Sequence, residues 1–153
     1  ITALSYVEGK YAFIEDGTAL PTRTISLLNQ PAPAPVVLLS GGETTVTIKG
    51  TGRGGRNTEF LLAFAITLFE RSNQHLSRVS AIACDTDGID GTEDNAGALY
   101  LPTTFQMARE QNINLAKALL ENDGYGAFKK LGNLVITGPT LTNVNDFRAI
   151  LIQ

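Results

Sequence analysis

Short apolar runs alternate with longer amphipathic segments along most of the chain. Val36 to Leu39 and Val79 to Cys84 are rich in β-forming residues, and each run predicts a strand that is buried on both faces. From Thr45 to Lys49 apolar and polar residues alternate, which predicts a half-exposed strand. Further strands are predicted at residues 11–14, 134–137 and 147–152.

The segment from Asn57 to Arg71 has the periodicity of a helix. Its apolar stripe consists of Leu61, Phe64, Ala65, Leu68 and Phe69. The residues that widen this stripe are Phe60, Leu62 and Ile66. Two explanations of the wide stripe stay open. The helix packs against both a sheet and a neighbouring helix, or it forms an interface with a domain that is absent from this chain.

Capping residues predict shorter helices in the second half of the chain. Thr103 and Gln106 have the spacing of a capping box. Asn114 and Asp123 are each expected to cap a further helix, and Gly132 is expected to end the last one. The predicted helices span residues 103–111, 114–121 and 123–132.

Strands that alternate with helices predict an α/β domain, with α/β/α layers around a mixed, mostly parallel sheet. We assign residues 36–153 to this domain. Prolines between residues 31 and 35 form an extended spacer. Residues 1–35 stay unassigned, and a linker from a missing N-terminal domain is one interpretation. Because the chain begins at Ile1 and not at methionine, we expect it to be a piece of a larger protein.

The composition is that of one globular domain in a reducing compartment. Of the 153 residues, 43% are hydrophobic and 18% are charged, which supplies a core and carries no disorder signature. The net charge of -3 argues against nucleic acid as the main partner. The lone cysteine, Cys84, cannot form an internal disulfide, which favours the cytoplasm. No apolar stretch is long enough to cross a membrane, so a membrane partner is not expected.

Polar, glycine-bearing loops follow three of the predicted strands, at residues 40–43, 85–91 and 138–146. Ligands of open α/β sheets bind beyond the carboxyl ends of the strands, so parallel neighbouring strands would bring these loops together. A fourth loop, residues 52–57, holds two arginines among three glycines directly ahead of the long helix. Flexible backbone amides, a positive helix N-terminus and the donor fork of arginine together predict an anion site.

Each of these features also has a simpler interpretation. The glycine-rich loop lacks the Lys-Ser or Lys-Thr pair of a phosphate-binding P-loop. Arg56 could pair with Asp87 or Glu43 and bind no ligand. The aspartates between residues 85 and 90 resemble a calcium loop, but Ala96 stands where an EF-hand has its bidentate glutamate.

Four motifs together resemble the MOFRL domain, in that family's order: residues 39–48, 52–57, 86–91 and 137–146. This domain is the C-terminal part of class II glycerate kinases, which are often labelled hydroxypyruvate reductases. The resemblance covers about residues 36–152. It implies a larger enzyme in which ATP phosphorylates the 2-hydroxyl of D-glycerate, in a cleft shared with an N-terminal domain that this chain lacks.

The resemblance and the loops together assign roles to individual residues. Arg56 is expected to be catalytic and to bind an anion, either the carboxylate of glycerate or a phosphate of ATP. Asp87 is expected to be catalytic and to orient Arg56, and Asp90 to hold, through water, the Mg²⁺ that accompanies ATP. Substrate or phosphate binding is expected of Gly41, Gly42, Glu43, Gly54, Gly55, Asn57, Thr140, Thr142, Asn143, Asn145 and Asp146.

Three residues depart from the family pattern. Asp85 stands where a small residue is usual, Leu141 replaces a glycine, and Thr58 replaces a glutamine. The extra carboxylate of Asp85 and the glycine lost at Leu141 imply an altered substrate preference or lost activity. Separately, we expect the isolated chain to be inactive. An NAD(P)H-dependent hydroxypyruvate reductase and a non-catalytic small-molecule-binding or assembly module stay open as alternatives, as does a homo-oligomer. The reductase would need a dinucleotide fingerprint, which residues 50–55 match poorly.

Overall fold

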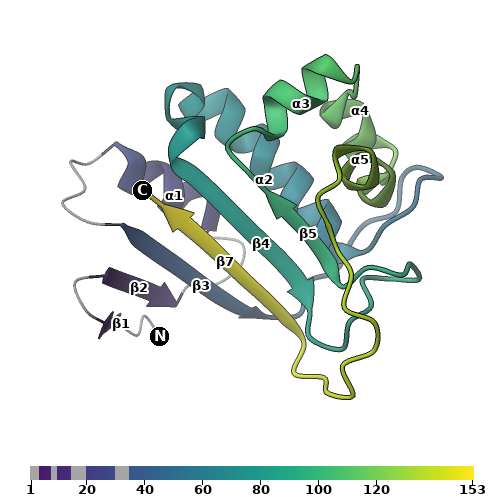
Figure 1. Cartoon of the computed structure of the whole chain (residues 1–153), viewed down its shortest axis with the longest axis horizontal. Helices are drawn as coiled ribbons and strands as arrows, with labels where there is room; N and C mark the ends of the chain where they lie inside the picture. The colour runs from purple at the N-terminus through teal and green to yellow at the C-terminus, as the bar shows by residue number, and fades with distance from the viewer. Residues whose placement is uncertain (1–3, 8–9, 15–19, 30–34) are drawn as a thin grey trace.

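The computed structural model describes residues 4–7, 10–14, 20–29 and 35–153, which form a seven-stranded sheet with helices packed against it (Figure 1). The strands lie in the order β1-β2-β3-β7-β4-β5-β6. They span Leu4–Val7 (β1), Lys10–Ile14 (β2), Val36–Gly42 (β3), Val79–Asp85 (β4), Gly97–Tyr100 (β5), Leu134–Val135 (β6) and Asp146–Ile152 (β7).

The sheet is mixed, but the prediction that it is mostly parallel is wrong. Among the described strands only β2 and β3 pair in parallel, and every other pair is antiparallel. The last strand of the chain causes the difference, because β7 returns between β3 and β4 and runs against both of them. β3 and β4 therefore point the same way without being neighbours.

Strands β1 and β2, from the unassigned first part of the chain, lie in the same sheet as the later strands. β2 coincides with the strand predicted at residues 11–14, and it pairs with β3. Most of the proline spacer lies outside the described residues. The domain boundary at residue 35 stays a prediction.

Helices α1 to α5 lie on one face of the sheet (Figure 1). They span Leu20–Leu28 (α1), Arg56–Ser72 (α2), Thr104–Glu110 (α3), Leu115–Leu120 (α4) and Gly124–Leu131 (α5), and a 3-10 helix follows α2 at Asn73–Arg78 (η1). On the central strands Leu38 and Ile150 are buried toward the helices, whereas Val37 and Leu151 are half-buried on the opposite face. No described helix covers that face, so the architecture has two layers and not the predicted three.

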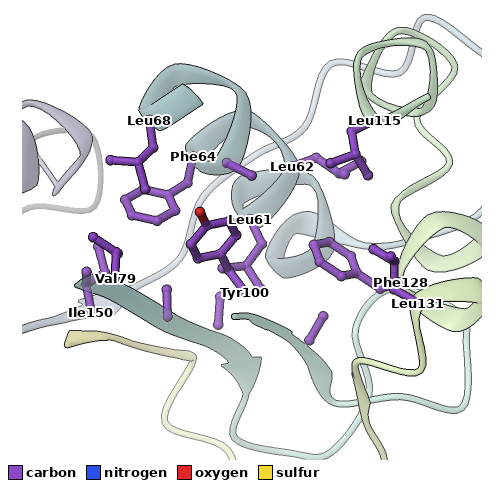
Figure 2. Close-up of a cluster of buried hydrophobic side chains, with 14 of the residues drawn as sticks. Leu61, Leu62, Phe64, Leu68, Val79, Tyr100, Leu115, Phe128, Leu131 and Ile150 are labelled. Atoms are coloured by element: carbon purple, nitrogen blue, oxygen red, sulfur yellow. The ribbon is translucent and has the colours of Figure 1, made fainter. Parts of the chain in front are cut away.

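Helix α2 lies at the centre of the core. Leu61, Phe64 and Leu68 are buried, and Phe64 packs edge-on against Tyr100 of β5, with ring centroids 5.8 Å apart (Figure 2). α2 contacts β4, β5 and three other helices, α1, α4 and α5. Packing against the sheet and neighbouring helices therefore accounts for most of the wide apolar stripe, although Phe69 stays 41% exposed. No described helix has the length and apolar character needed to cross a membrane.

Residues 45–49 do not form the predicted strand. This segment is irregular, and its last backbone donors bond to a side chain instead of a neighbouring strand. Oδ1 of Asn122 accepts hydrogen bonds from the amides of Lys49, at 2.7 Å, and Gly50, at 2.9 Å. An alternating pattern predicts a strand only where an edge is available to pair with it, and here a side chain satisfies those donors.

Two of the three predicted helix caps form as expected. The side chains of Asn114 and Asp123 each accept a hydrogen bond from the amide three residues later, and Gly132 ends α5 with a φ of 72°. The capping box at Thr103 is wrong, since that side chain makes no capping hydrogen bond. The hydroxyl of Thr104 instead accepts a hydrogen bond from the amide of Leu101, three residues earlier and outside the helix.

Leu141 carries backbone strain that one substitution should relieve. Its φ of 62° lies in the left-handed region, and its side chain is 98% exposed, so packing offsets none of the strain. We expect Leu141→Gly to raise the free energy of unfolding by about 1 kcal/mol, as measured by chemical denaturation. Asn145→Gly is the matched control, because Asn145 has a φ of 65° but asparagine tolerates this region. Equal gains, or a loss for Leu141→Gly, would contradict this explanation.

Candidate functional site

The predicted loops meet at one edge of the sheet, although the strands that carry them are not parallel neighbours. β3 ends at Gly42, β4 ends at Asp85, and β7 begins at Asp146. Asp146 pairs in register with Gly42 on one side and with Asp85 on the other. The carboxyl ends of β3 and β4 therefore flank the amino end of β7. We call the loops at this edge, residues 40–57, 85–91 and 138–146, the rim.

Arg56 joins two aspartates of the rim. Its Nε donates to both carboxylate oxygens of Asp146, at 2.8 and 3.1 Å, and its Nη2 donates to Asp85. The side chains of both aspartates are buried, whereas that of Arg56 is 21% exposed. Burial alone would lower the pKa of Arg56, but attraction to Asp146 and Asp85 outweighs it and raises that pKa. The pairing with Asp87 that the sequence left open is not formed.

Asp90 occupies the N-terminus of α2 from inside the protein. It is fully buried, and its two oxygens accept hydrogen bonds from the backbone amides of Asn57 and Thr58, each at 2.9 Å. A carboxylate here also interacts favourably with the helix dipole. Gly55 allows this approach, since a Cβ at that position would lie 2.3 Å from Oδ1 of Asp90. The helix terminus thus already holds an anion, and a ligand anion would have to use the Arg56 side chain.

Arg148 lies beneath the rim, and no motif of the sequence pointed to it. It is fully buried, and its Nη2 donates to Asp146 at 2.6 Å and to the hydroxyl of Thr44 at 3.0 Å. Its guanidinium lies 5.0 Å from the ring centroid of Phe60. Asn57 also donates to Asp146, at 2.9 Å. The signal that could have found Arg148 was the alternation of buried and more exposed residues along β7. Every second residue of this strand is buried, and Arg148 lies on the buried face.

The loop at residues 138–146 is tied to the turn that carries Asp87. One oxygen of Asp87 accepts a hydrogen bond from the amide two residues later, at 2.8 Å, and the other accepts from Nδ2 of Asn143, at 3.3 Å. The amide of Thr140 donates to the Asp87 carbonyl at 3.0 Å. Thr140, Thr142, Asn143 and Asn145 are all exposed. The structure therefore brings Asp87 and this loop together on the open side of the rim.

The remaining predicted residues line the approach to Arg56. Gly41, Gly42 and Glu43 are exposed at the end of β3, and the charge of Glu43 helps to raise the pKa of Arg56. Gly54 is exposed ahead of α2 and has a φ of 146°, a conformation that side chains rarely adopt. The other arginine of this loop, Arg53, points to a separate partner, Glu93. Of the two arginines of this loop, Arg56 and not Arg53 therefore contacts a predicted binding residue, Asp146.

The geometry no longer favours Asp90 as the residue that holds Mg²⁺ through water. Both of its oxygens accept backbone hydrogen bonds in the interior. Within the described residues no group of three or more His, Cys, Asp or Glu side chains could hold a metal by itself. Cys84 is a buried core residue, and this burial raises the pKa of its thiol to about 12.

The stability of the protein should depend on the protonation of Asp85. Burial raises the pKa of Asp85 above 3.8, against the attraction of Arg56, and the charges of Asp87 and Asp146 add to the rise. Its stabilising contribution is therefore complete below the unfolded-state pKa and is lost as pH rises through the folded-state pKa. We expect Asp85→Asn to gain stability relative to the unmodified protein from about pH 3.5 to pH 7. Urea unfolding across this range would show a constant or shrinking difference if this is incorrect.

Comparison with known proteins identifies the family. The profile of the MOFRL family matches residues 36–146. This chain belongs to the MOFRL family. Among its relatives, a protein of Agrobacterium vitis, provisionally named a hydroxypyruvate reductase, is 53% identical over 89% of this chain and 30% of its own length. A glycerate 2-kinase of Pyrococcus horikoshii is 45% identical over 76% of this chain and 26% of its own length.

Solved structures of MOFRL relatives share the fold. A glycerate kinase of Thermotoga maritima superimposes with a TM-score of 0.77 at 35% identity, over 93% of this chain and 36% of that one. The MOFRL chain thus spans about a third of the length of the relatives it matches. Relatives of this chain thus carry two kinds of name, hydroxypyruvate reductase and glycerate kinase. The dinucleotide fingerprint fails in the structure too, because no strand directly precedes residues 50–55.

Proposed function

We propose that this chain is the C-terminal part of a glycerate 2-kinase and contributes the rim to a cleft that a further domain completes. The observation that carries this proposal is Arg56, an arginine that two aspartates hold in place at a partly open edge of the sheet. The names of the family's kinases, found on relatives that are 40–45% identical, support the same reaction. A cytoplasmic location and a homo-oligomer stay predictions of the sequence.

Phosphoryl transfer depends mainly on positioning and on neutralising charge, so it requires little covalent chemistry from the protein. Arg56 would bind an oxyanion, either the carboxylate of glycerate or a phosphate of ATP. Asp146 fixes the guanidinium through Nε, and Arg148 and Asn57 fix Asp146 in turn. The orientation of Arg56, which the sequence assigned to Asp87, would thus be provided by Asp146.

Asp87 and the loop at residues 138–146 would form the opposite side of the site. Asn143 holds one oxygen of Asp87, and the exposed threonines of the loop offer hydroxyl groups to a polar substrate. The Mg²⁺ that accompanies ATP would neutralise phosphate charge, and Asp87 would hold it through water. Asp90 would contribute by capping α2, which carries Arg56.

Paired activity assays test the proposed function on the complete natural protein. One assay supplies ATP, Mg²⁺ and D-glycerate and detects ADP, and the other supplies hydroxypyruvate and NAD(P)H and detects oxidation of the cofactor. We expect turnover in the first assay alone. Turnover only in the second would establish the reductase, and inactivity in both would favour the non-catalytic binding or assembly module.

The 153-residue chain by itself should fold but should not phosphorylate glycerate. Its relatives are about three times longer, and the described residues contain no lysine-bearing P-loop to hold ATP phosphates. Circular dichroism would report the fold, and the ADP assay would report turnover. Steady-state phosphorylation by this chain alone would overturn the idea that a second domain completes the site.

A further inference from the structure

Asp85 and Asp146 are directly opposite one another across β4 and β7. Two like charges at such a position repel each other, and both of these side chains are buried. Arg56 offsets the repulsion by donating Nε to Asp146 and Nη2 to Asp85. The only partly exposed member of this trio is therefore Arg56, and both of its engaged nitrogens face an internal carboxylate.

The two aspartates differ in how firmly they are held. Asp146 accepts hydrogen bonds from Asn57 and Arg148 as well as from Arg56. It therefore keeps hydrogen-bond donors even if Arg56 turns toward a ligand. Asp85 accepts from Nη2 of Arg56 and otherwise, at 3.2 Å, from the backbone amide of Asp87. Asp85 is thus the exchangeable partner of Arg56, and Asp146 is the permanent one.

We propose that Asp85 is a specificity-determining residue, an internal anion that a ligand must displace from Nη2 of Arg56. The ligand chemistry is that of an oxyanion, a carboxylate or a phosphate, because either presents the oxygen pair that a guanidinium fork binds. This inference rests on the anion-binding role of Arg56 in the proposed function. On this proposal the rim rejects anions that bind Arg56 only weakly, because every ligand anion competes with the carboxylate of Asp85 for the same guanidinium.

Calorimetric titration of the chain with inorganic phosphate, and separately with D-glycerate, tests this inference. Asp85→Asn keeps the shape of the side chain and removes the competing charge. We expect it to bind the preferred anion at least about tenfold more tightly, the effect of one charge-assisted hydrogen bond. The gain with phosphate identifies a phosphate subsite, and a gain with glycerate alone identifies a carboxylate subsite. Asp85→Ser serves as a second variant if the first unfolds.

Glu93→Gln is the matched control. It removes the carboxylate partner of Arg53, the other arginine of the same loop, and should change anion affinity by less than about twofold. The double variant Arg56→Lys with Asp85→Asn should lose the gain, which locates the binding at Arg56. Equal or weaker binding by Asp85→Asn, or no measurable binding in any variant, overturns the inference.

This binding result is independent of turnover. If Asp85→Asn gains affinity while the complete protein fails to phosphorylate glycerate, the displaced-anion role stands and the kinase proposal falls. If the complete protein is an active kinase and Asp85→Asn binds anions more weakly, Asp85 orients Arg56 and does not compete with the ligand. The two proposals can therefore fail separately.

Discussion

Asp90→Asn is expected to lower the free energy of unfolding by about 3 kcal/mol. The reason is that the NH₂ group of the new side chain would face a buried backbone amide, which is also a donor. Both oxygens of Asp90 accept backbone hydrogen bonds at the first turn of α2. An asparagine presents one oxygen and one NH₂ group, so either Asn57 or Thr58 would lose its acceptor. The change also removes the negative charge that the positive end of the helix favours. Urea denaturation at neutral pH measures the loss.

The matched control is Asp123→Asn at the start of α5. Asp123 also caps a helix through its side chain, but asparagine is as good as aspartate at an ordinary cap. The control should therefore change stability by less than about 0.5 kcal/mol. Comparable losses in the two variants would show that Asp90 is an ordinary cap and not a buried anion that α2 requires.

The same variant separates the two roles that Asp90 could have. If Asp90 holds Mg²⁺, Asp90→Asn in the complete natural protein should change the magnesium dependence of activity while the protein stays folded. If Asp90 is the cap described above, the variant should unfold more easily and leave the magnesium dependence of the folded fraction unchanged. A variant as stable as the unmodified protein with a shifted magnesium dependence would restore the original assignment.

The sequence predicted the central elements of the fold for two reasons. A helix forms its hydrogen bonds and caps among residues that are close in sequence, and a strand deep in the core has a recognisable apolar run. The helix predicted at residues 57–71 matches α2, and the buried runs at residues 36 and 79 match β3 and β4. Side-chain caps at Asn114 and Asp123 depend on a few adjacent residues, and both occur. Gly97–Tyr100 was not predicted as a strand, because two small residues at its start give a weak β signal.

Strand order could not be read from the chain, because no local pattern records which strand lies between two others. β7 returns between β3 and β4, and that choice makes the sheet mostly antiparallel. The rim was still predicted from three loops, since an antiparallel strand starts at the edge where its neighbours end. The pairing of Arg56 with Asp85 and Asp146 depends on this register, so the sequence left open which carboxylate Arg56 would contact.

In the complete natural protein, Arg56→Lys should lower kcat/KM for glycerate phosphorylation by roughly thirtyfold, equivalent to about 2 kcal/mol or more. A lysine keeps the charge, but its single nitrogen lacks the planar fork that pairs with Asp146 and presents two further donors to a ligand in a fixed geometry. It would also leave Asp85 and Asp146 opposed without the fork between them. Rates should be compared where unfolding curves show that both proteins are fully folded.

Arg53→Lys is the matched control for that measurement. Arg53 lies three residues earlier in the same loop, but its side chain is 63% exposed and pairs with Glu93. Its guanidinium also lies 4.7 Å from the ring centroid of Tyr125, away from the paired aspartates. A lysine can keep an exposed ion pair of this kind, so kcat/KM should fall by less than about threefold. Similar losses for the two variants would mean that the loop contributes general positive charge. A loss confined to Arg56→Lys would mean that the rim recognises its anion through the planar guanidinium fork, which Asp146 holds in place.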